Sequence, residues 1–300
     1  MKSTILIDGG AGRQICAIPA LEKYVATNPD TTIVTYFWTP LYWGNKLLAN
    51  KTFDNTTKGL FERIRHTKIL KPEPYFNTNY INEKTNMATA FNEEINNDTS
   101  TPGKPRIYLT EAEKSRFDEV LRKDGLKKTI LFQPFGSTAT IANNNITDNT
   151  IRSFTKELTV KAMTAIKKAG FQIALFDDRD IPFIDRNQVL PIRGVGIREW
   201  AIIASRCDYY FGCDSAGQHL AYAFDKPGTV VFGGTSPINC SYPEWFTIIQ
   251  KNEPRTYMPY RLAEFDMYIG ETNNHDLMNF GKEEIDAIVE NLIKNIRSKV

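Results

Sequence analysis

The chain contains 300 residues, of which 41% are hydrophobic and 24% are charged, and its formal net charge is +2 at pH 7. This length suits two domains of ordinary size, and the composition of a folded globular protein excludes a disordered or fibrous chain. No apolar run reaches the roughly 20 residues that cross a bilayer. The small net charge does not indicate a nucleic-acid-binding protein, which usually has a strongly basic domain, and it does not exclude one, because a local basic groove is enough.

The N-terminal run 4–8 is strand-like, is too short for the core of a signal peptide, and precedes no small-residue cleavage site. We therefore expect a cytoplasmic protein without stable membrane insertion. The three histidines and four cysteines show no CxxC pair and no zinc-type spacing, so we expect buried free thiols and no metal site.

The first half of the chain alternates strand-like and helix-like segments. In chain order these are a strand at 4–8, a glycine-rich turn, a helix near 14–27 and a strand at 32–37; residues 41–98 read only as mixed loops and helices. Thr110 and Glu113 form the pattern of a capping box and predict a helix that runs to residue 123. This helix stops at Asp124-Gly125, where we place the domain boundary.

The second half repeats this alternation. We expect a strand at 129–133, a turn at 134–138, helices at 149–169, 197–206 and 215–224, and strands at 171–176, 207–211 and 229–232. A last helix at 282–298 has one apolar face, which we expect to pack back on the first domain. The chain is therefore predicted to be an α/β protein with two Rossmann-like domains, 1–124 and 125–281, facing each other across a cleft.

The segment around 209–224 carries the clearest chemical signal. A strand ends, small and polar residues form a tight turn, and a helix begins whose free N–H groups and dipole favour an anion. Ser215, Ala216 and Gly217 are small enough for a diphosphate to approach the backbone, and His219 on the first helical turn can donate to a phosphate oxygen. A second small-residue turn, 232–237, follows the next strand, at the sheet edge where α/β folds bind ligands.

Residues 213–237 resemble the donor-site signature of the heptosyltransferase-like glycosyltransferases, glycosyltransferase family 9. That signature reads D-[ST]-G-x-x-H-L-A-A-A-x-x-x-P, then a strand, then F-G-x-T-x-P. The segments 5–21, 105–121 and 131–137 are similar to the family's first strand with its "PAL" helix, its interdomain segment and the start of its second domain. The similarity covers most of the chain and is weakest over 41–98.

This resemblance implies a GT-B glycosyltransferase that uses a nucleotide-sugar as co-substrate, inverts the sugar, needs no cofactor or metal, and glycosylates a saccharide. Carried over by position, the donor site comprises Gly136, Ser137, Thr138, Asp214, Ser215, Ala216, Gly217, His219 and Thr235. The acceptor belongs to the first domain, for which we predict Gly10, Gly12 and the basic residues Arg63 and Arg65 as contacts.

The sequence departs from the family pattern at two positions. Ala216 stands where the family has glycine, with Gly217 one place later. The family's general base, an Asp directly after the glycine that corresponds to Gly12, is replaced by Arg13. Arginine stays protonated, so it cannot accept the acceptor's proton. Asp8, at the end of the same strand, is the nearest substitute, and its alternative role is to cap the turn; Arg13 either binds a phosphate or is solvated.

Other interpretations remain open. Asp178-Arg179-Asp180 has the D-x-D form of metal-dependent glycosyltransferases, although solvated acids are the commoner outcome. The acceptor is alternatively a modified base in DNA, as for some bacteriophage glycosyltransferases. The chain is alternatively a nucleotide-sugar binding protein that has lost the general base of the transfer reaction. An unrelated Rossmann protein such as an epimerase is disfavoured, because the turn Gly9-Gly10-Ala11-Gly12 lacks G-x-G-x-x-G.

Overall fold

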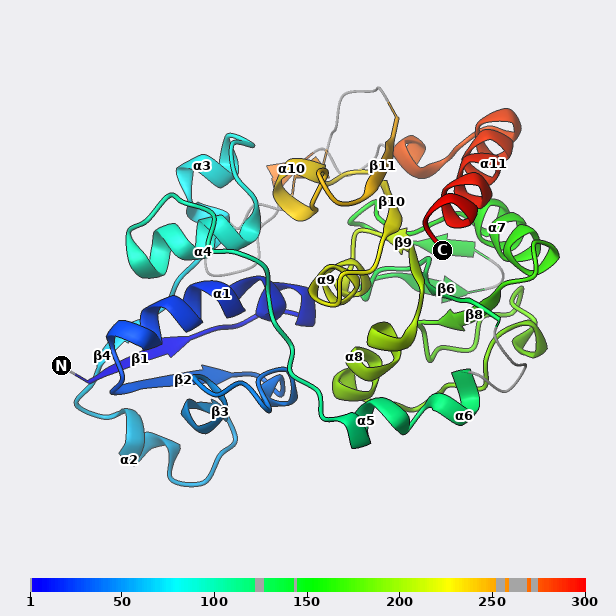
Figure 1. Ribbon diagram of the computed structural model, residues 1–300. Helices are drawn as coiled ribbons and strands as arrows, with labels where there is room; N and C mark the ends of the chain where they lie inside the picture. The colour runs from blue at the N-terminus through cyan, green and yellow to red at the C-terminus, as the bar shows by residue number, and fades with distance from the viewer. Residues whose placement is uncertain (1, 122–126, 143–144, 252–256, 259–268, 271–274) are drawn as a thin grey trace.

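The computed structural model describes residues 2–121, 127–142, 145–251, 257–258, 269–270 and 275–300. Two parallel sheets, each flanked by helices, lie one after the other along the chain (Figure 1). The predicted domain boundary at Asp124-Gly125 lies outside the described residues. In the part of the chain that is described, no helix is both long and apolar enough to cross a membrane.

The first sheet has the strand order β3-β2-β1-β4, with all strands parallel. The strands are β1 (Ser3–Leu6), β2 (Thr31–Thr35), β3 (Thr52–Asp54) and β4 (Lys68–Leu70). Helix α1 (Ala11–Thr27) follows β1 and packs against α4 (Met87–Asn96). Because β1 is flanked by β2 on one side and β4 on the other, the crevice for a ligand opens at its carboxyl end.

Short elements make up the stretch 41–98 that the sequence left unassigned. Besides β3, β4 and α4, they are η1 (Thr39–Leu41), η2 (Ala49–Lys51), α2 (Leu60–Ile64), η3 (Pro74–Phe76) and α3 (Thr78–Ile81). Such short segments carry too few residues to show a clear hydrophobic period, which explains why they escaped prediction.

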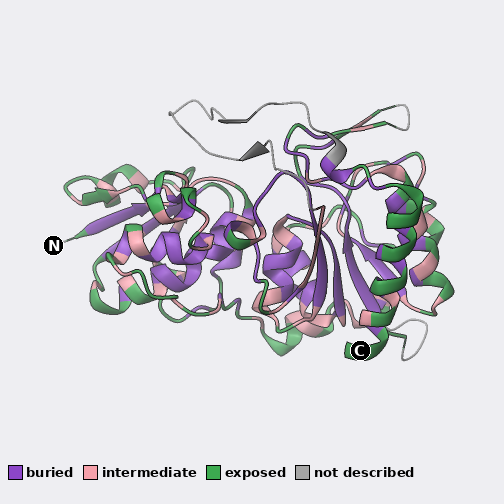
Figure 2. Cartoon of the chain, turned by 90° about the horizontal axis from the view of Figure 1, so that it is seen from above, coloured by how far each residue is buried: buried purple, intermediate pink, exposed green. Residues whose placement is uncertain are grey.

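The second sheet has the order β11-β10-β9-β5-β8, again parallel throughout. Its strands are β5 (Thr129–Gln133), β8 (Gln172–Leu175), β9 (Tyr209–Cys213), β10 (Gly228–Phe232) and β11 (Thr247–Gln250). Every residue of the four strands before β11 is buried, as the purple strands of Figure 2 show. Burial on both faces is typical of parallel sheets covered by helices, here α7 (Lys156–Lys168), α8 (Ile197–Arg206) and α9 (Ala216–Ala223).

Two helices differ from their predicted bounds. The helix expected at 149–169 begins only at Lys156, where the Thr155 side chain caps it. Residues 148–155 form turns and bends instead, and they follow a hairpin of β6 (Thr140–Ala142) and β7 (Asn145–Thr147). The capping box of Thr110 and Glu113 is confirmed, but its helix divides into α5 (Glu111–Ser115) and α6 (Asp118–Leu121).

The C-terminal helix α11 (Lys282–Lys299) packs on the second half of the molecule, beside α7 (Figure 1). Its apolar face, which includes Ile285 and Leu292, belongs to the same core cluster as Met163 and Ile166 of α7. An ion pair joins Lys161 and Asp286. The expectation that this helix packs back on the first domain is therefore wrong, because its apolar stripe covers that of α7 instead.

The two halves share one core cluster, to which residues of both α1 and α9 contribute. Arg198 of α8, which is 7% exposed, donates to the backbone carbonyls of Pro40, Trp43 and Tyr108 and to the carboxylate of Glu113. From α10 (Pro237–Cys240), Asn239 donates to the carbonyls of Tyr80 and Thr85. The remaining elements are η4 (Arg186–Gln188), β12 (Tyr257–Met258), β13 (Ile269–Gly270) and η5 (His275–Met278).

Candidate functional site

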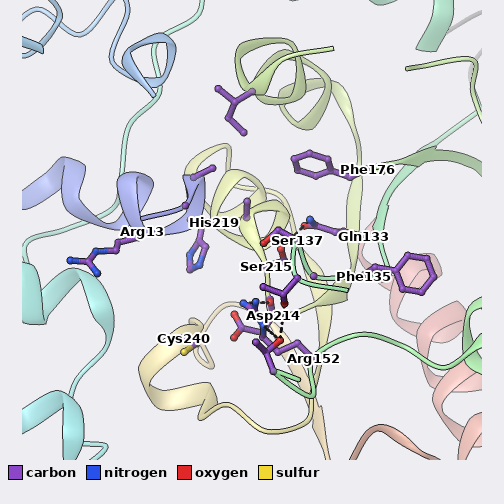
Figure 3. A pocket seen from close by; sticks show the side chains of 18 of the residues that line it. Arg13, Gln133, Phe135, Ser137, Arg152, Phe176, Asp214, Ser215, His219 and Cys240 are labelled. Atoms are coloured by element: carbon purple, nitrogen blue, oxygen red, sulfur yellow. Dashed lines mark hydrogen bonds between the residues drawn. The ribbon is translucent and has the colours of Figure 1, made fainter. Parts of the chain in front are cut away.

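A cavity of about 590 Å³ lies between the two halves, at the carboxyl ends of both sheets (Figure 3). Its N-terminal wall comes from the β1–α1 turn and the start of α1, the segment after β2, η3 and the first residue of α4. Its C-terminal wall comes from the loops after β5, β8, β9 and β10, from the residues before α7, and from the starts of α8 and α9. Most predicted site residues line it: Gly10, Gly12, Arg13, Gly136, Ser137, Thr138, Asp214, Ser215, Ala216, His219 and Thr235. Four other predicted site residues do not line the cavity: Asp8, Gly217, Arg63 and Arg65.

The turn into α9 is fixed by Gln133 at the end of β5. The Gln133 amide donates to Ser215 Oγ over 3.1 Å and accepts from the N–H of Gly217 over 2.7 Å. That N–H is therefore already satisfied within the protein. A Cβ at Gly217 would lie 2.5 Å from Gln133 Oε1 and 2.7 Å from the Tyr210 ring, so the glycine is needed for close packing. Ser215 and Ala216 remain at the cavity.

His219 points from α9 into the junction with α1 (Figure 3). Its Nδ1 lies 3.0 Å from the Tyr242 hydroxyl and 3.5 Å from the Cys16 thiol, which itself lies 3.6 Å from that hydroxyl. A Cβ at Gly12 would come within 2.8 Å of His219 Cδ2 and 3.2 Å of Nε2. Gly12 therefore lets α1 approach the Cδ2–Nε2 edge of the imidazole, and His219 lines the cavity.

The partners of His219 favour one tautomer. Burial raises the pKa of Cys16 to about 12 and that of Tyr242 well above its usual value, so both keep their hydrogens. Both hydrogens find acceptors when the Tyr242 hydroxyl donates to Nδ1 and the thiol donates to the Tyr242 oxygen. The ring proton is then on Nε2. Burial also lowers the pKa of His219 to about 4, so the ring is a neutral donor at neutral pH.

The loop after β5 is held by a buried carboxylate, Asp148. Asp148 accepts hydrogen bonds from Thr138 Oγ1 at 3.0 Å, Thr150 N at 2.9 Å and Ser153 Oγ at 2.6 Å. Burial alone would raise the pKa of Asp148, but the hydrogen bonds from Ser153 and Thr150 outweigh it and lower the pKa. Ser153 also accepts from the N–H of Gly136. These bonds fix Gly136, Ser137 and Thr138 at the edge of the cavity.

Arg152 is a cavity residue that the sequence interpretation missed. Its Nε donates to Thr150 Oγ1 over 2.8 Å, and its Nη1 donates to the Asp214 carbonyl over 3.4 Å. Burial works against its charge, but Asp214 and Asp148 outweigh that effect and raise its pKa, so the guanidinium stays protonated. The signal for it was the polar sequence Asp148-Asn149-Thr150, at the point where we placed the start of a helix.

Asp214 links the two turns of the predicted donor site. Its carboxylate accepts from Gln218 Nε2 at 2.6 Å and from Thr235 Oγ1 at 2.8 Å. Burial raises the pKa of this carboxyl, an effect that Arg152 and Thr235 partly offset. Asp214 therefore organises the site, and both its oxygens already have partners.

Asp8 and Arg13 belong to an ion cluster beside the cavity, in which the Arg13 side chain is 5% exposed and that of Asp8 is 29% exposed. The Arg13 guanidinium lies 3.1 Å from Asp8 and 2.9 Å from Glu73, and it stacks over Tyr75 and Phe91 at 5.2 and 5.5 Å. Figure 3 shows it directed away from the other labelled residues. The geometry therefore gives no support to Asp8 as the base, because Asp8 does not line the cavity and its carboxylate is paired. Arg13 instead joins α1 to the segment before η3. This differs from both predicted alternatives, a phosphate contact and a solvated side chain.

The loop after β8 combines an aromatic pair with paired acids. Phe176 stacks on Trp200 with ring centroids 4.2 Å apart, and both rings line the cavity. Arg179 pairs with Asp177 at 2.5 Å and donates to the carbonyl of Gly136, which braces the loop after β5. Asp180 is paired with Arg193 at the surface. Within the described residues, no group of three or more His, Cys, Asp and Glu side chains is arranged to hold a metal.

The two basic residues predicted for the acceptor lie on and beside α2, outside the cavity lining. Arg65 pairs with Glu62 at 2.8 Å and its side chain is 51% exposed. The Arg63 guanidinium lies over the Phe53 ring at 4.4 Å. The structure does not bring them together with the donor-site residues.

No family model and no curated protein matches the sequence. Solved glycosyltransferases match the fold. A family 9 glycosyl transferase from Veillonella parvula gives a TM-score of 0.64 at 15% identity, over 98% of this chain and 97% of that chain. The ADP-heptose LPS heptosyltransferase II of E. coli gives 0.60 at 15% identity, over 97% and 99%. The iron-containing dodecameric glycosyltransferase TibC of E. coli gives 0.61 at 11% identity, over 99% and 76%.

At these identities the similarity establishes the architecture. The strand orders, the helices on both sheets and the position of the cavity agree with it. The chain therefore has the GT-B fold of the family 9 glycosyltransferases, with two Rossmann-like domains facing each other across a cleft.

Proposed function

We propose that the protein is a glycosyltransferase that moves a sugar from a nucleotide-sugar donor to an acceptor hydroxyl. The observation that carries the proposal is the position of Arg152 on the cavity beside the start of α9 and the loop after β5. A permanent cation, a helix N-terminus and a loop rich in hydroxyls together form a site for a diphosphate. The His219 Nε2–H adds a neutral donor to the same wall.

The rest of the C-terminal wall suits the nucleoside. The stacked pair of Phe176 and Trp200 offers an aromatic surface for a base, and Asp177 and Asp178 lie next to it along the cavity. With the diphosphate at Arg152 and the base at Phe176, the donor sugar would face α1 and the N-terminal wall. The structural similarity to the ADP-heptose LPS heptosyltransferase II of E. coli supports an ADP-sugar as the first donor to test.

The reaction would invert the sugar. The acceptor oxygen attacks the anomeric carbon as the bond to the diphosphate breaks on the opposite face, and the acceptor's proton passes to a base. Arg152 and the α9 N-terminus would stabilise the charge on the leaving diphosphate, so no metal is required. Asp8 stays the predicted base for this proton, although its pairing with Arg13 argues against that role.

The test begins with binding. The thermal stability of the full chain would be measured with nucleoside diphosphates and their sugars, since a ligand at a hundred times its Kd stabilises a protein by about 2.7 kcal/mol. Transfer or donor hydrolysis would then be followed with and without a chelator, in the wild type and in Asp8→Asn. We expect stabilisation by one nucleotide class and turnover that survives the chelator. Absence of nucleotide binding would refute the proposal, and restoration by manganese would refute the metal-free mechanism.

A second candidate function is a nucleotide-sugar binding protein without transferase activity. It is favoured by Arg13, which occupies the family's base position and is locked between Asp8 and Glu73. Donor binding without any transfer or hydrolysis, across neutral and charged acceptors, would establish it. A loss of turnover of about 10²–10⁴-fold in Asp8→Asn with donor binding intact would instead assign the base and exclude this candidate.

A further inference from the structure

One end of the cavity is lined by sulfur atoms. Cys16 of α1, Met87 at the start of α4 and Cys240 of α10 all line the cavity. The segment that leads into α4 lies against α10, because Asn239 donates to the carbonyl of Thr85 over 2.9 Å. Helix α4 also packs along α1, and Met87 and Cys16 belong to one core cluster. Three elements from both halves of the molecule therefore bring sulfur to the same end of the cavity.

This end lies across the diphosphate site from the aromatic pair. Figure 3 shows Cys240 and Phe176 on opposite sides of Asp214. Burial raises the pKa of Asp214, and Arg152 and the Cys240 thiol are among the groups that partly offset this effect, so the thiol lies close to the carboxylate. With the base on Phe176 and the diphosphate at Arg152, the donor sugar would extend toward Cys240.

The sulfur atoms at this end are neutral and make weak hydrogen bonds. Burial raises the pKa of Cys16 to about 12 and that of Cys240 well above its usual value, so both thiols stay protonated. The Cys16 Sγ lies 3.5 Å from His219 Nδ1, and the Cys240 Sγ lies 3.6 Å from the Tyr80 hydroxyl. Met87 has a thioether, which is a weak acceptor. Such a surface suits a methyl group and gives a buried hydroxyl a poor partner.

The ring hydroxyls of a sugar would have a different neighbour. Thr235 lines the cavity and donates through Oγ1 to Asp214 over 2.8 Å, and the same oxygen can still accept from a sugar hydroxyl. Tyr75 adds a phenol to the lining. Hydroxyls beside a sulfur surface match a hexose ring that carries a methyl group on C5.

We propose that the donor sugar is a 6-deoxyhexose whose C5 methyl lies against Cys16, Met87 and Cys240. The proposal rests on the proposed function and deepens it by naming the class of sugar. An N-acetylhexosamine also carries a methyl group, but its amide N–H and carbonyl would be buried beside the same sulfur atoms. The hydroxymethyl group of an ordinary hexose would exchange hydrogen bonds to water for the same weak partners.

Binding of matched donors tests the proposal without turnover. Glucose, mannose, their 6-deoxy forms and N-acetylglucosamine, each carried on ADP, GDP, UDP or TDP, would be titrated calorimetrically into the full chain beside the bare diphosphates. On the nucleotide that binds, we expect the 6-deoxy sugar of the better-binding pair to bind about tenfold more tightly than its parent hexose, because the added hydroxyl enters an apolar pocket. Equal affinities, or tighter binding of a parent hexose or of N-acetylglucosamine, would overturn the proposal. If none of the four bare diphosphates binds, the proposed function fails instead.

Two serine substitutions separate the sulfur surface from a general effect on the fold. In Cys240→Ser a hydroxyl replaces the thiol, so we expect the preference for the 6-deoxy sugar to fall to about threefold or less, through tighter binding of the parent hexose. Cys207→Ser, at a buried cysteine outside the cavity lining, is the matched control and should keep the full preference. The affinity for the bare diphosphate reports folding of both variants. A preference that survives in Cys240→Ser, or that is lost in both variants, would overturn the proposal.

Discussion

Arg13, which is buried, and Arg152, which is partly buried, both line the cavity, yet they are used differently. Arg13 is held by two carboxylates and two aromatic rings and is directed away from the cavity, whereas Arg152 contacts a hydroxyl and a carbonyl and stays at the surface of the cavity. The partners of a buried cation therefore decide its role. Two ion pairs hold Arg13 in the fold, whereas Arg152 makes no ion pair within the described residues and keeps attraction for a ligand, although Asp214 and Asp148 raise its pKa.

Replacing Arg152 tests this comparison most strongly. In Arg152→Met we expect the affinity for the nucleoside diphosphate to fall about a hundredfold, since a hydrogen bond to a charged group contributes roughly 1.5–3 kcal/mol. Calorimetric titration would measure it, with circular dichroism to confirm folding. Arg193→Met, at an exposed arginine paired with Asp180, is the matched control. Equal affinities in the two variants would show that Arg152 does not hold the ligand.

The neutral histidine of the C-terminal wall predicts an acid-sensitive fold. Because burial lowers the pKa of His219 from 6.5 to about 4, the unfolded chain binds the proton first as the pH falls. The stability is thus intact above about pH 6.5 and falls between there and pH 4, by about 3 kcal/mol at 1.36 kcal/mol per pKa unit. Urea unfolding of the wild type and His219→Gln at pH 7 and 4.5 would measure the difference.

His66→Asn is the control for that series. His66 is exposed and adopts a positive φ of 63°, a conformation that asparagine tolerates. It should keep the acid sensitivity of the wild type. If His219→Gln also kept the acid sensitivity of the wild type, the assignment of His219 as a buried neutral side chain would be refuted.

A methyl group at Gly12 should disturb the same ring by contact alone. In Gly12→Ala the new Cβ would lie 2.8 Å from His219 Cδ2, so the imidazole must shift and we expect donor affinity to fall about tenfold. In Gly10→Ala, two residues earlier, the Cβ would meet nothing within 4 Å, and donor affinity should be unchanged. Thermal shifts with a nucleoside diphosphate would compare them. Similar affinities would mean that the position of His219 does not matter for the donor.

The smallest effect on donor affinity is expected from a change in the tautomer of His219. Tyr242→Phe removes the hydroxyl next to Nδ1 but keeps the stacking on Tyr222 at 3.6 Å, so we expect a loss of donor affinity of about fivefold. Nitrogen-15 NMR of the ring nitrogens would show the proton on Nε2 in the wild type and a mixture of tautomers in the variant. A wild-type proton on Nδ1 would contradict the assignment of His219 as a donor.

Local signals and distant pairings were not equally predictable. The capping box of Thr110 and Glu113 and the turn at Ser215 involve neighbours in sequence, and the sequence located both. Arg152 gains its role from Asp214, and Arg13 from Glu73, each about 60 residues away along the chain. No local pattern reports such pairings. The same reason applies to α11, whose apolar face was evident but whose partner, α7, was not.

The core cluster that joins α1 to α9 has a consequence for how the protein unfolds. Separating the two halves would expose that shared apolar surface to water and would break the bonds of Arg198 to Pro40 and Trp43. Neither half can therefore melt without weakening the other. Despite its two sheets, the protein should unfold in a single cooperative transition, and a fragment carrying either sheet alone should be prone to aggregation.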